Sequence, residues 1–305
     1  MGKTALLFPG QGSQSPGMGA ELAKDFASAR AVFEQADEAL GFSLSKLCFE
    51  GPAEELALTE NTQPAILTTS VAVLAAAREK RLEGDYVAGH SLGEYSALVA
   101  AGSIDFTDAV KLVRNRGRYM QEAVPTGVGA MAAILGLSGE VVNEVCEQAA
   151  QGQVVSPANL NSPGQVVIAG HTEAVERVAE AAKEAGARKA IMLNVSAPFH
   201  CALMEPARDR LTPELDAIEF RDLETPLVNN ADANELSSGE AAREGLKKQI
   251  PNPVLWEMSV RRLVELGVDR FIEVGSGRVL TGLLRNIDRS FKGVAVGDRA
   301  SLEKL

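Results

Sequence analysis

The chain has 305 residues, of which 46% are hydrophobic and 23% charged, and its formal net charge is −11. This length suits one large domain or one and a half, and the composition is that of an ordinary globular protein. The acidic charge argues against broad nucleic-acid binding, so an anionic partner would need a local basic patch.

The first 126 residues are predicted to alternate strands and helices. A buried strand over 4–8 leads into the glycine-rich loop PGQGSQSPGMG, and a second strand is expected at 85–89. Helices are expected over about 20–40, 63–80, 91–102 and 105–123. Asp105, with Asp108 three residues further on, is expected to begin the last of these helices.

The pattern changes after Pro125. Strands are expected at 130–135, 154–160, 165–170 and 189–195, and helices at 138–150 and 172–186. The resulting order β-α-β-β-α-β is typical of a ferredoxin-like unit, so we expect a small inserted subdomain over residues 127–196.

After this segment the alternation resumes, with strands at 227–230 and 271–275 and helices at 253–267 and 277–286. Alternating strands and helices predict a mostly parallel sheet covered by helices. We therefore expect an α/β fold in which residues 1–126 and 197–305 form a large α/β-hydrolase-like domain.

The stretch GHSLGEYSAL, residues 89–98, contains Gly-x-Ser-x-Gly with Ser91 at its centre. A short apolar strand before it and a helix after it are typical of a nucleophile elbow. Gly89 and Gly93 stand where a Cβ would clash in so sharp a turn. The alternative is an ordinary glycine-bounded turn with a serine N-cap.

A serine nucleophile needs a base, usually histidine, and the chain has three. His171 begins a charged helix, which indicates a solvent-side or capping residue. His90 is adjacent to Ser91 and would point elsewhere, although it could line the pocket. His200 is expected at the end of a strand, where ligands bind in open α/β sheets, so we favour it over a packed core histidine. Because no Asp or Glu between residues 91 and 200 follows an obvious strand, a backbone carbonyl is the expected orienting group.

Acyl transfer also needs two N–H donors for the oxyanion. The backbone N–H of Leu92 is the expected first donor, and the loop FPGQGSQ, with Gln11 at its apex, is expected to bring the second. A phosphate loop is excluded because no Gly-Lys-Ser/Thr follows. A plain turn remains the alternative.

The expected helix at 105–123 carries an arginine in an unusual place. Arg116 falls within its apolar stripe, whereas Arg114 and Arg118 fall on the polar face. A buried guanidinium is costly unless it meets an anion. Either an internal salt bridge or a substrate carboxylate, bound by both arms of the guanidinium, would meet that need.

The sequence lacks features typical of metal-binding, membrane and secreted proteins. The three cysteines (Cys48, Cys146 and Cys201) lack metal-ligand spacing and predict a reducing compartment without disulfides. No apolar run approaches the length of a membrane helix, and the N-terminus does not read as a signal peptide. We expect a cytoplasmic protein without a metal or membrane association.

Together these stretches resemble the malonyl-CoA:acyl-carrier-protein transacylase family. The matches cover nearly the whole chain in the family's order: FPGQGSQ, TQPAI, GHSLGEYSAL, RNRGRYMQEA, NVSAPFHCALM, VNNADA, QIPNPVLW and EVGSG. The resemblance implies that Ser91 accepts the acyl group and that His200 is the general base. It also implies that the backbone carbonyl of Gln249 orients His200 and that the Gln11 and Leu92 amides form the oxyanion hole.

The resemblance further implies that Arg116 binds the malonyl carboxylate and that His90 adds a polar contact at the pocket. Phe199 matches members that take malonyl rather than the bulkier methylmalonyl group. Cys201 is not expected to act as a second nucleophile. The inserted ferredoxin-like subdomain also agrees with the family's fold.

The implied reaction is ping-pong transfer from malonyl-CoA to acyl carrier protein for fatty-acid synthesis, by a monomer without a cofactor. A serine esterase or thioesterase and a non-catalytic carrier-binding module are the alternatives. Because such carriers are acidic, docking needs cations on this acidic chain, and the candidates are Arg188 and Lys189, or Lys247 and Lys248.

Overall fold

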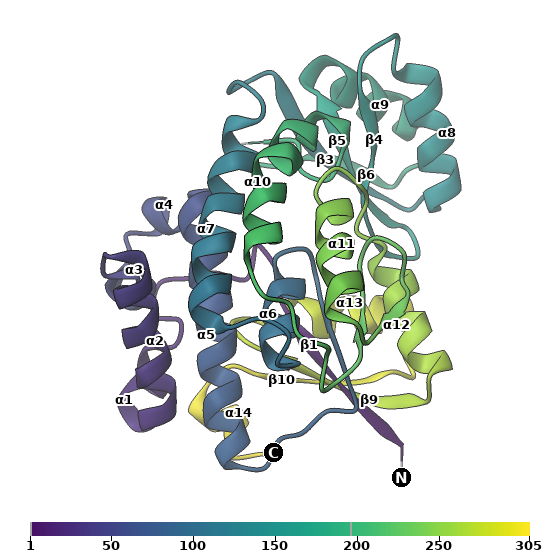
Figure 1. Ribbon diagram of the computed structural model, residues 1–305. Coiled ribbons are helices and arrows are strands. Elements are labelled where there is room, and N and C mark those ends of the chain that lie inside the picture. The colour runs from purple at the N-terminus through teal and green to yellow at the C-terminus, as the bar shows by residue number, and fades with distance from the viewer. Residues whose placement is uncertain (1, 196) are drawn as a thin grey trace.

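The computed structural model describes residues 2–195 and 197–305. Met1, where the expected large domain begins, and Ser196, where the expected subdomain ends, lie outside the described residues. The fold is mixed α/β and contains two separate sheets. In Figure 1 the smaller sheet, with α8 and α9, forms the upper part of the view, and both termini lie at the lower end.

The larger sheet has six strands in the order β10-β9-β1-β2-β7-β8, and every neighbouring pair is parallel except β7 and β8. The last four residues of β1 are all buried, as expected of a strand covered by helices on both faces. The strand bounds are β1 Lys3–Phe8, β2 Tyr86–Gly89, β7 Leu227–Val228, β8 Glu235–Leu236, β9 Val268–Val274 and β10 Lys292–Val296.

Twelve of the helices in the described residues pack around this sheet or extend from it (Figure 1). Their bounds are α1 Ala20–Asp25, α2 Ala27–Leu40, α3 Leu44–Glu50, α4 Ala53–Leu56, α5 Thr59–Glu79, α6 Gly93–Ala100, α7 Phe106–Glu122, α10 Glu205–Ala217, α11 Gly239–Gln249, α12 Trp256–Glu265, α13 Val279–Ile287 and α14 Arg299–Leu302. A 3-10 turn at Ala202–Met204 precedes α10.

Several expected elements differ in detail. The helix expected at 20–40 is divided by Phe26, which adopts an extended conformation between α1 and α2. The helix α5 begins before the expected position, so Pro64 lies inside it. Asp105 occupies the N-cap of α7 but its side chain makes no capping bond; it instead accepts a hydrogen bond from Arg221 at 2.9 Å.

The helices α10 and α11 are absent from the sequence-based expectation, as are β10 and α14. The sequence of α10 contains a proline near its start and Pro213 within it, which hides its helical character. The sequence of α11, GEAAREGLKKQ, has few apolar residues and two glycines, so its apolar period is weak. Tertiary packing of its buried face, which is made largely of small residues, stabilises α11.

The smaller sheet is antiparallel throughout, in the order β4-β5-β3-β6. Its strands are β3 Gly129–Leu135, β4 Val155–Ser162, β5 Gln165–His171 and β6 Lys189–Met192, and the helices α8 (Gly139–Ala149) and α9 (Thr172–Glu184) cover it. The strand expected at 189–195 ends at Met192. His200 therefore lies in an irregular segment after β6, which corrects the expectation that a strand would present it.

Main-chain hydrogen bonds join β4 of the smaller sheet to the segment that precedes α12 in the larger part. The N–H of Leu160 on β4 donates to the carbonyl of Val254 at 2.9 Å, and the N–H of Val254 donates to that of Ala158 at 2.9 Å. Val254 is fully buried just before α12. This connection sets the edge of the smaller sheet against the larger part and encloses a pocket between them.

Candidate active site

Ser91 occupies a strained turn between β2 and α6. Its φ is 52°, in the left-handed region, which costs a residue other than glycine about 1–2 kcal/mol. A Cβ on Gly89 would lie 2.0 Å from the carbonyl oxygen of Gly93, and a Cβ on Gly93 would lie 2.0 Å from that of Phe8. The turn therefore needs both glycines, and it projects Ser91 into the pocket.

Asn230 holds this turn from the side. Its Oδ1 accepts the Ser91 N–H at 2.7 Å, and its Nδ2 donates to the carbonyl of Gly89 at 2.7 Å. Asn230 is fully buried two residues after the end of β7, which pairs with β2. The strained backbone at Ser91 is thus stabilised by a neighbouring part of the same sheet.

His200 lies beside Ser91, with its Nε2 2.6 Å from Ser91 Oγ. Its Nδ1 lies 2.9 Å from the carbonyl oxygen of Gln249. Because a carbonyl only accepts hydrogen bonds, Nδ1 carries the proton and Nε2 is free to accept from the serine hydroxyl. The arrangement has the geometry of a nucleophile and a base, with a main-chain group as the orienting partner.

Burial keeps this imidazole neutral. His200 is 3% exposed, and burial, with a smaller contribution from the charge of Arg116, lowers the pKa of His200 to about 3. The cationic form is disfavoured in this environment because it would be desolvated next to a guanidinium. At neutral pH the imidazole is therefore in the form that accepts a proton.

Arg116 on α7 reaches the same serine. Its side chain is 1% exposed, and its Nη2 donates to Ser91 Oγ at 3.2 Å and to Gln249 Oε1 at 2.8 Å. Its Nη1 donates to Gln63 Oε1 at 2.7 Å. Among the described residues no carboxylate forms an ion pair with it, so of the two explanations offered for its burial the internal salt bridge is not made.

These groups meet in one pocket between the two sheets. Most of its walls come from the larger part, and the smaller sheet supplies one side through β3, β4 and β5. The lining includes every residue that the sequence singled out for the site except Gln249: Gln11, His90, Ser91, Leu92, Arg116, Phe199 and His200. Gln249 is fully buried behind them.

The other two histidines have different partners. The Nε2 of His90 lies 2.8 Å from Oδ1 of Asn161 on β4, so His90 contacts the smaller sheet, and burial lowers its pKa. His171 occupies the N-cap position of α9, but its side chain makes no capping hydrogen bond; its Nδ1 instead accepts the N–H of Val154 at 3.0 Å. Neither ring is hydrogen-bonded to Ser91.

Cys201, next to His200, is a buried free thiol whose Sγ lies 3.2 Å from the carbonyl of Pro198. Burial raises the pKa of Cys201 to about 11, so it is protonated at neutral pH and is a poor nucleophile. Among the described residues no cluster of His, Cys, Asp or Glu could hold a metal ion, and no helix is long and apolar enough to cross a membrane.

Sequence reasoning missed several polar residues of the site: Gln63, Glu94, Asn161 and Asn230. Gln63 and Asn230 lie within TQPAI and VNNADA, stretches that carried the resemblance without being given a role. Buried amides in otherwise apolar surroundings are a usable signal, because such groups need hydrogen-bond partners.

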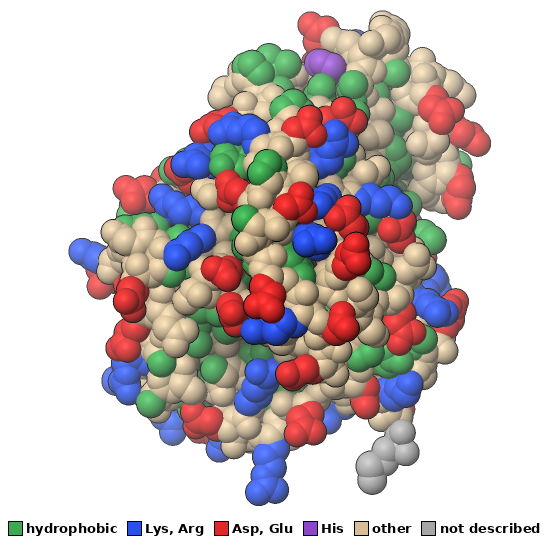
Figure 2. Space-filling model, in the orientation of Figure 1, with side chains coloured by type: hydrophobic (Ala, Val, Ile, Leu, Met, Phe, Trp, Pro, Cys, Tyr) green, Lys and Arg blue, Asp and Glu red, His purple; other side chains and the backbone are tan. Residues whose placement is uncertain are grey.

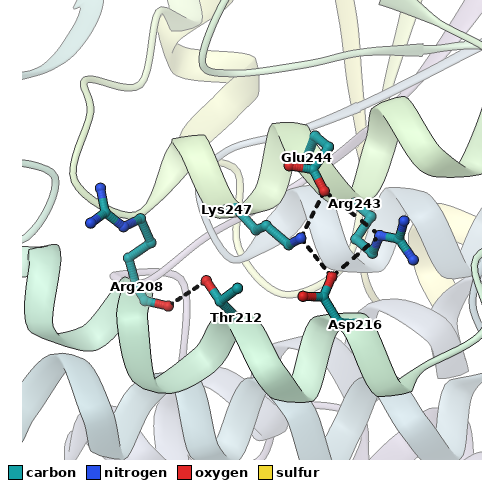
Figure 3. A network of polar contacts seen from close by, with 6 residues as sticks. All are labelled: Arg208, Thr212, Asp216, Arg243, Glu244 and Lys247. Carbon is teal, nitrogen blue, oxygen red and sulfur yellow. Dashed lines mark hydrogen bonds and ion pairs between the residues drawn. The ribbon is translucent and has the colours of Figure 1, made fainter.

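The basic residues considered for docking differ in their surroundings. Figure 3 shows Lys247 on α11 between Asp216 and Glu244, with its Nζ 2.5 Å and 2.7 Å from their carboxylate oxygens. Lys248 is paired with Asp232. Within residues 2–195 and 197–305 neither Arg188 nor Lys189 forms an ion pair. Figure 2 shows acidic and basic side chains interspersed over the visible face.

The family model for the acyl transferase domain matches residues 5–300. The malonyl CoA-acyl carrier protein transacylases of Bacillus subtilis (50% identical, covering 99% of this chain and 96% of theirs) and Escherichia coli K12 (51%, covering 99% and 98%) are similar over their full length.

Solved structures agree. An acyl carrier protein S-malonyltransferase from Vibrio cholerae superposes with a TM-score of 0.97 at 50% identity, covering 99% of each chain. A malonyl-transacylase in complex with its type II PKS acyl-carrier protein also gives 0.97, at 51% identity, covering 99% of this chain and 98% of that one.

Proposed function

The chain belongs to the malonyl CoA-acyl carrier protein transacylases, within the acyl transferase domain family, and from this we infer that it transfers malonyl groups from malonyl-CoA to acyl carrier protein. The carrier accepts the group on its phosphopantetheine thiol, and the product supplies fatty-acid synthesis. One observation carries the inference most directly. Arg116, a buried cation without a carboxylate partner among the described residues, donates to the hydroxyl of Ser91.

We propose the following first half-reaction. Arg116 binds the malonyl carboxylate and places the thioester carbonyl at Ser91. His200 takes the hydroxyl proton as Ser91 Oγ attacks, and the backbone N–H groups of Leu92 and Gln11 stabilise the oxyanion. The tetrahedral intermediate then collapses, the C–S bond breaks, and His200 returns the proton to the leaving thiolate of coenzyme A.

The second half-reaction reverses these roles. The thiol of the carrier enters after coenzyme A has left, and His200 accepts its proton as the sulfur attacks the malonyl ester. The C–O bond to Ser91 breaks and the serine recovers its proton from His200. The cycle is ping-pong, and its groups need no metal or organic cofactor because the chain supplies nucleophile, base and anion site.

Three other residues complete the proposed site. The carbonyl of Gln249 orients His200 in place of a carboxylate. His90 contributes a polar contact and, through Asn161, keeps the smaller sheet against the pocket. Phe199, which lines the pocket, would contact a branching methyl group and so favours malonyl over methylmalonyl.

A hydrolase would share the serine and the base but release malonate to water. The test is to isolate the malonyl-enzyme and mix it with holo acyl carrier protein or with buffer alone. We expect the ester to be transferred to the carrier thiol much faster than it is lost to water. An ester that hydrolyses equally fast with and without carrier would identify a hydrolase.

We propose that the larger part is α/β-hydrolase-like and the smaller a ferredoxin-like insertion over residues 127–196, within a large domain of residues 1–126 and 197–305. The strand order β4-β5-β3-β6 with two covering helices supports the ferredoxin-like description. We also propose that the protein is a monomer and that it is cytoplasmic; three buried free thiols support the reducing compartment.

A further inference from the structure

Glu94 is a buried carboxyl group that the proposed reaction does not use. It lies in the first turn of α6, three residues after Ser91, and is fully buried. Its Oε2 accepts hydrogen bonds from the backbone N–H of Asn230 at 2.9 Å and from Nε2 of Gln249 at 2.9 Å. Burying a carboxyl group costs free energy unless it is hydrogen-bonded, and both hydrogen bonds of Glu94 are to residues of the site.

The partners of Gln249 define the orientation of its side-chain amide. Its Oε1 faces Arg116 Nη2, which only donates. Its Nε2 faces oxygens only: Glu94 Oε2, the Ser91 carbonyl at 3.0 Å, and Asn230 Oδ1 at 3.3 Å. A flipped amide would direct N–H groups at a guanidinium and a carbonyl at these oxygens, which is unfavourable on both sides.

We propose that Glu94 is a positioning residue for substrate selection: its Oε2 fixes the Gln249 amide so that the amide oxygen holds Arg116 beside Ser91. This inference rests on the proposed function, in which Arg116 binds the malonyl carboxylate. Glu94 does not touch the substrate. It acts through Gln249, whose backbone carbonyl independently orients His200.

The site needs an acceptor at this position rather than a negative charge. Burial raises the pKa of Glu94 to about 7, although the charge of Arg116 on α7 opposes the rise and that of Asp232 adds to it. Oε2 can accept from Gln249 in either protonation state. The second oxygen, Oε1, has no hydrogen-bond partner in the described part of the chain. Glutamine would therefore keep the acceptor, whereas aspartate would keep the charge but withdraw the acceptor by one methylene.

This pair of substitutions gives the test. Single-turnover loading of Ser91 is followed by mass for native protein, Glu94→Gln and Glu94→Asp, with malonyl-CoA and with acetyl-CoA, which lacks the carboxylate. We expect Glu94→Gln to keep the ratio of malonyl to acetyl loading within about three-fold of native. We expect Glu94→Asp to lower it by about ten-fold, the effect of one hydrogen bond in a network around a charged group.

A matched control is Glu273→Asp, at the other fully buried glutamate, whose carboxylate accepts the N–H groups of Leu280 and Thr281. It should lower stability and leave the ratio unchanged. If Glu94→Asp slows loading from malonyl-CoA and from acetyl-CoA equally, the role of Glu94 is merely structural. If Glu94→Gln lowers the malonyl-to-acetyl ratio as much as Glu94→Asp does, the negative charge matters. Either result overturns the proposal.

If Glu94→Asp does not fold, Gln249→Leu removes the same link while keeping the backbone carbonyl for His200. A lowered ratio in this variant supports the step from Gln249 to Arg116 on which the proposal depends, and an unchanged ratio overturns the proposal. Failure of the proposed function is a separate result, because native protein would then not load malonyl at all.

Discussion

The two sides of the pocket are held in place by different kinds of groups. On the reacting side, a strained main chain presents Ser91 and a main-chain carbonyl orients His200. On the anion-binding side, Arg116 is held by the side-chain amides of Gln63 and Gln249. The reacting groups are thus positioned mainly by main-chain groups, with the Asn230 side chain bracing the Ser91 turn, whereas the guanidinium that would select the acyl group is held by side chains alone.

Gln249 belongs to both sides. Its carbonyl oxygen serves His200 and its amide oxygen serves Arg116, and α11 ends at this residue. Side-chain substitutions on the anion-binding side should therefore change selectivity without stopping the reaction.

Removing the base should slow both donors alike. His200→Ala is expected to lower Ser91 loading by about 10³- to 10⁴-fold, the range for a general base, with malonyl-CoA and with acetyl-CoA. Rapid-quench measurement of enzyme-bound acyl group gives both rates. A loss of rate confined to malonyl-CoA would instead place His200 on the anion-binding side.

Removing the cation should affect one donor only. Arg116→Ala is expected to lower kcat/KM for malonyl-CoA by about 100-fold, because a buried, hydrogen-bonded charge pair with the substrate is lost. Loading from acetyl-CoA should remain within a few-fold of native. Arg116→Lys should recover little of the kcat/KM for malonyl-CoA, because the point charge of an ammonium group does not reproduce the two-armed hydrogen bonding of a guanidinium. Equal losses for both donors would remove the carboxylate role.

Gln63 holds the guanidinium of Arg116 from the other side, and Gln63→Leu should weaken that support. It removes the acceptor for Nη1, and we expect kcat/KM for malonyl-CoA to fall by about ten-fold because a hydrogen bond to a charged group is lost. Acetyl loading should stay unchanged. Steady-state release of CoA, with acyl carrier protein present as acceptor, measures both rates, and a comparable fall for acetyl-CoA would mean that Gln63 also supports the reacting side.

Docking of the acyl carrier protein is expected to depend on cations at the surface. Arg188→Gln is expected to raise the KM for acyl carrier protein by about two- to five-fold at low salt, because an unpaired cation steers an acidic partner. Lys247→Gln, the matched control at a cation already paired with Asp216 and Glu244, should have a smaller effect. If the KM of the native protein for acyl carrier protein does not rise with salt concentration, docking is not electrostatic.

The rate of Ser91 loading should depend very little on pH. With the pKa of His200 lowered to about 3, the base stays neutral between pH 8 and pH 5, and loading from acetyl-CoA should be nearly constant. A histidine with the ordinary pKa of about 6.5 would lose about 30-fold at pH 5. A fall of that size in the rate of acetyl loading would show that burial does not control this base.

The central residues of the site could be predicted from the sequence because each has a local signal. Ser91 stands in a recognisable turn, His200 remains after two other histidines are set aside, and Arg116 interrupts an apolar stripe. Gln249 came from the family resemblance alone, since a backbone carbonyl leaves no mark on residue type. Glu94 and Asn230 escaped because their partners are distant along the chain.

The fold shows the same limit. The alternation of strands and helices was sufficient for the mixed α/β class and for both sheets. It failed for α10 and α11, where prolines and polar residues hide the helical period and tertiary packing provides the stability. His200 was expected at a strand end, yet an irregular segment presents it with a φ of 59°.

The proposed reaction depends on Ser91 carrying the malonyl group. The most direct test is the intact mass of the native protein and of Ser91→Ala after incubation with malonyl-CoA alone, followed by peptide mapping. We expect one malonyl adduct on the native chain, located at Ser91, and none on the variant. An adduct at another residue, or none on the native chain, would contradict it.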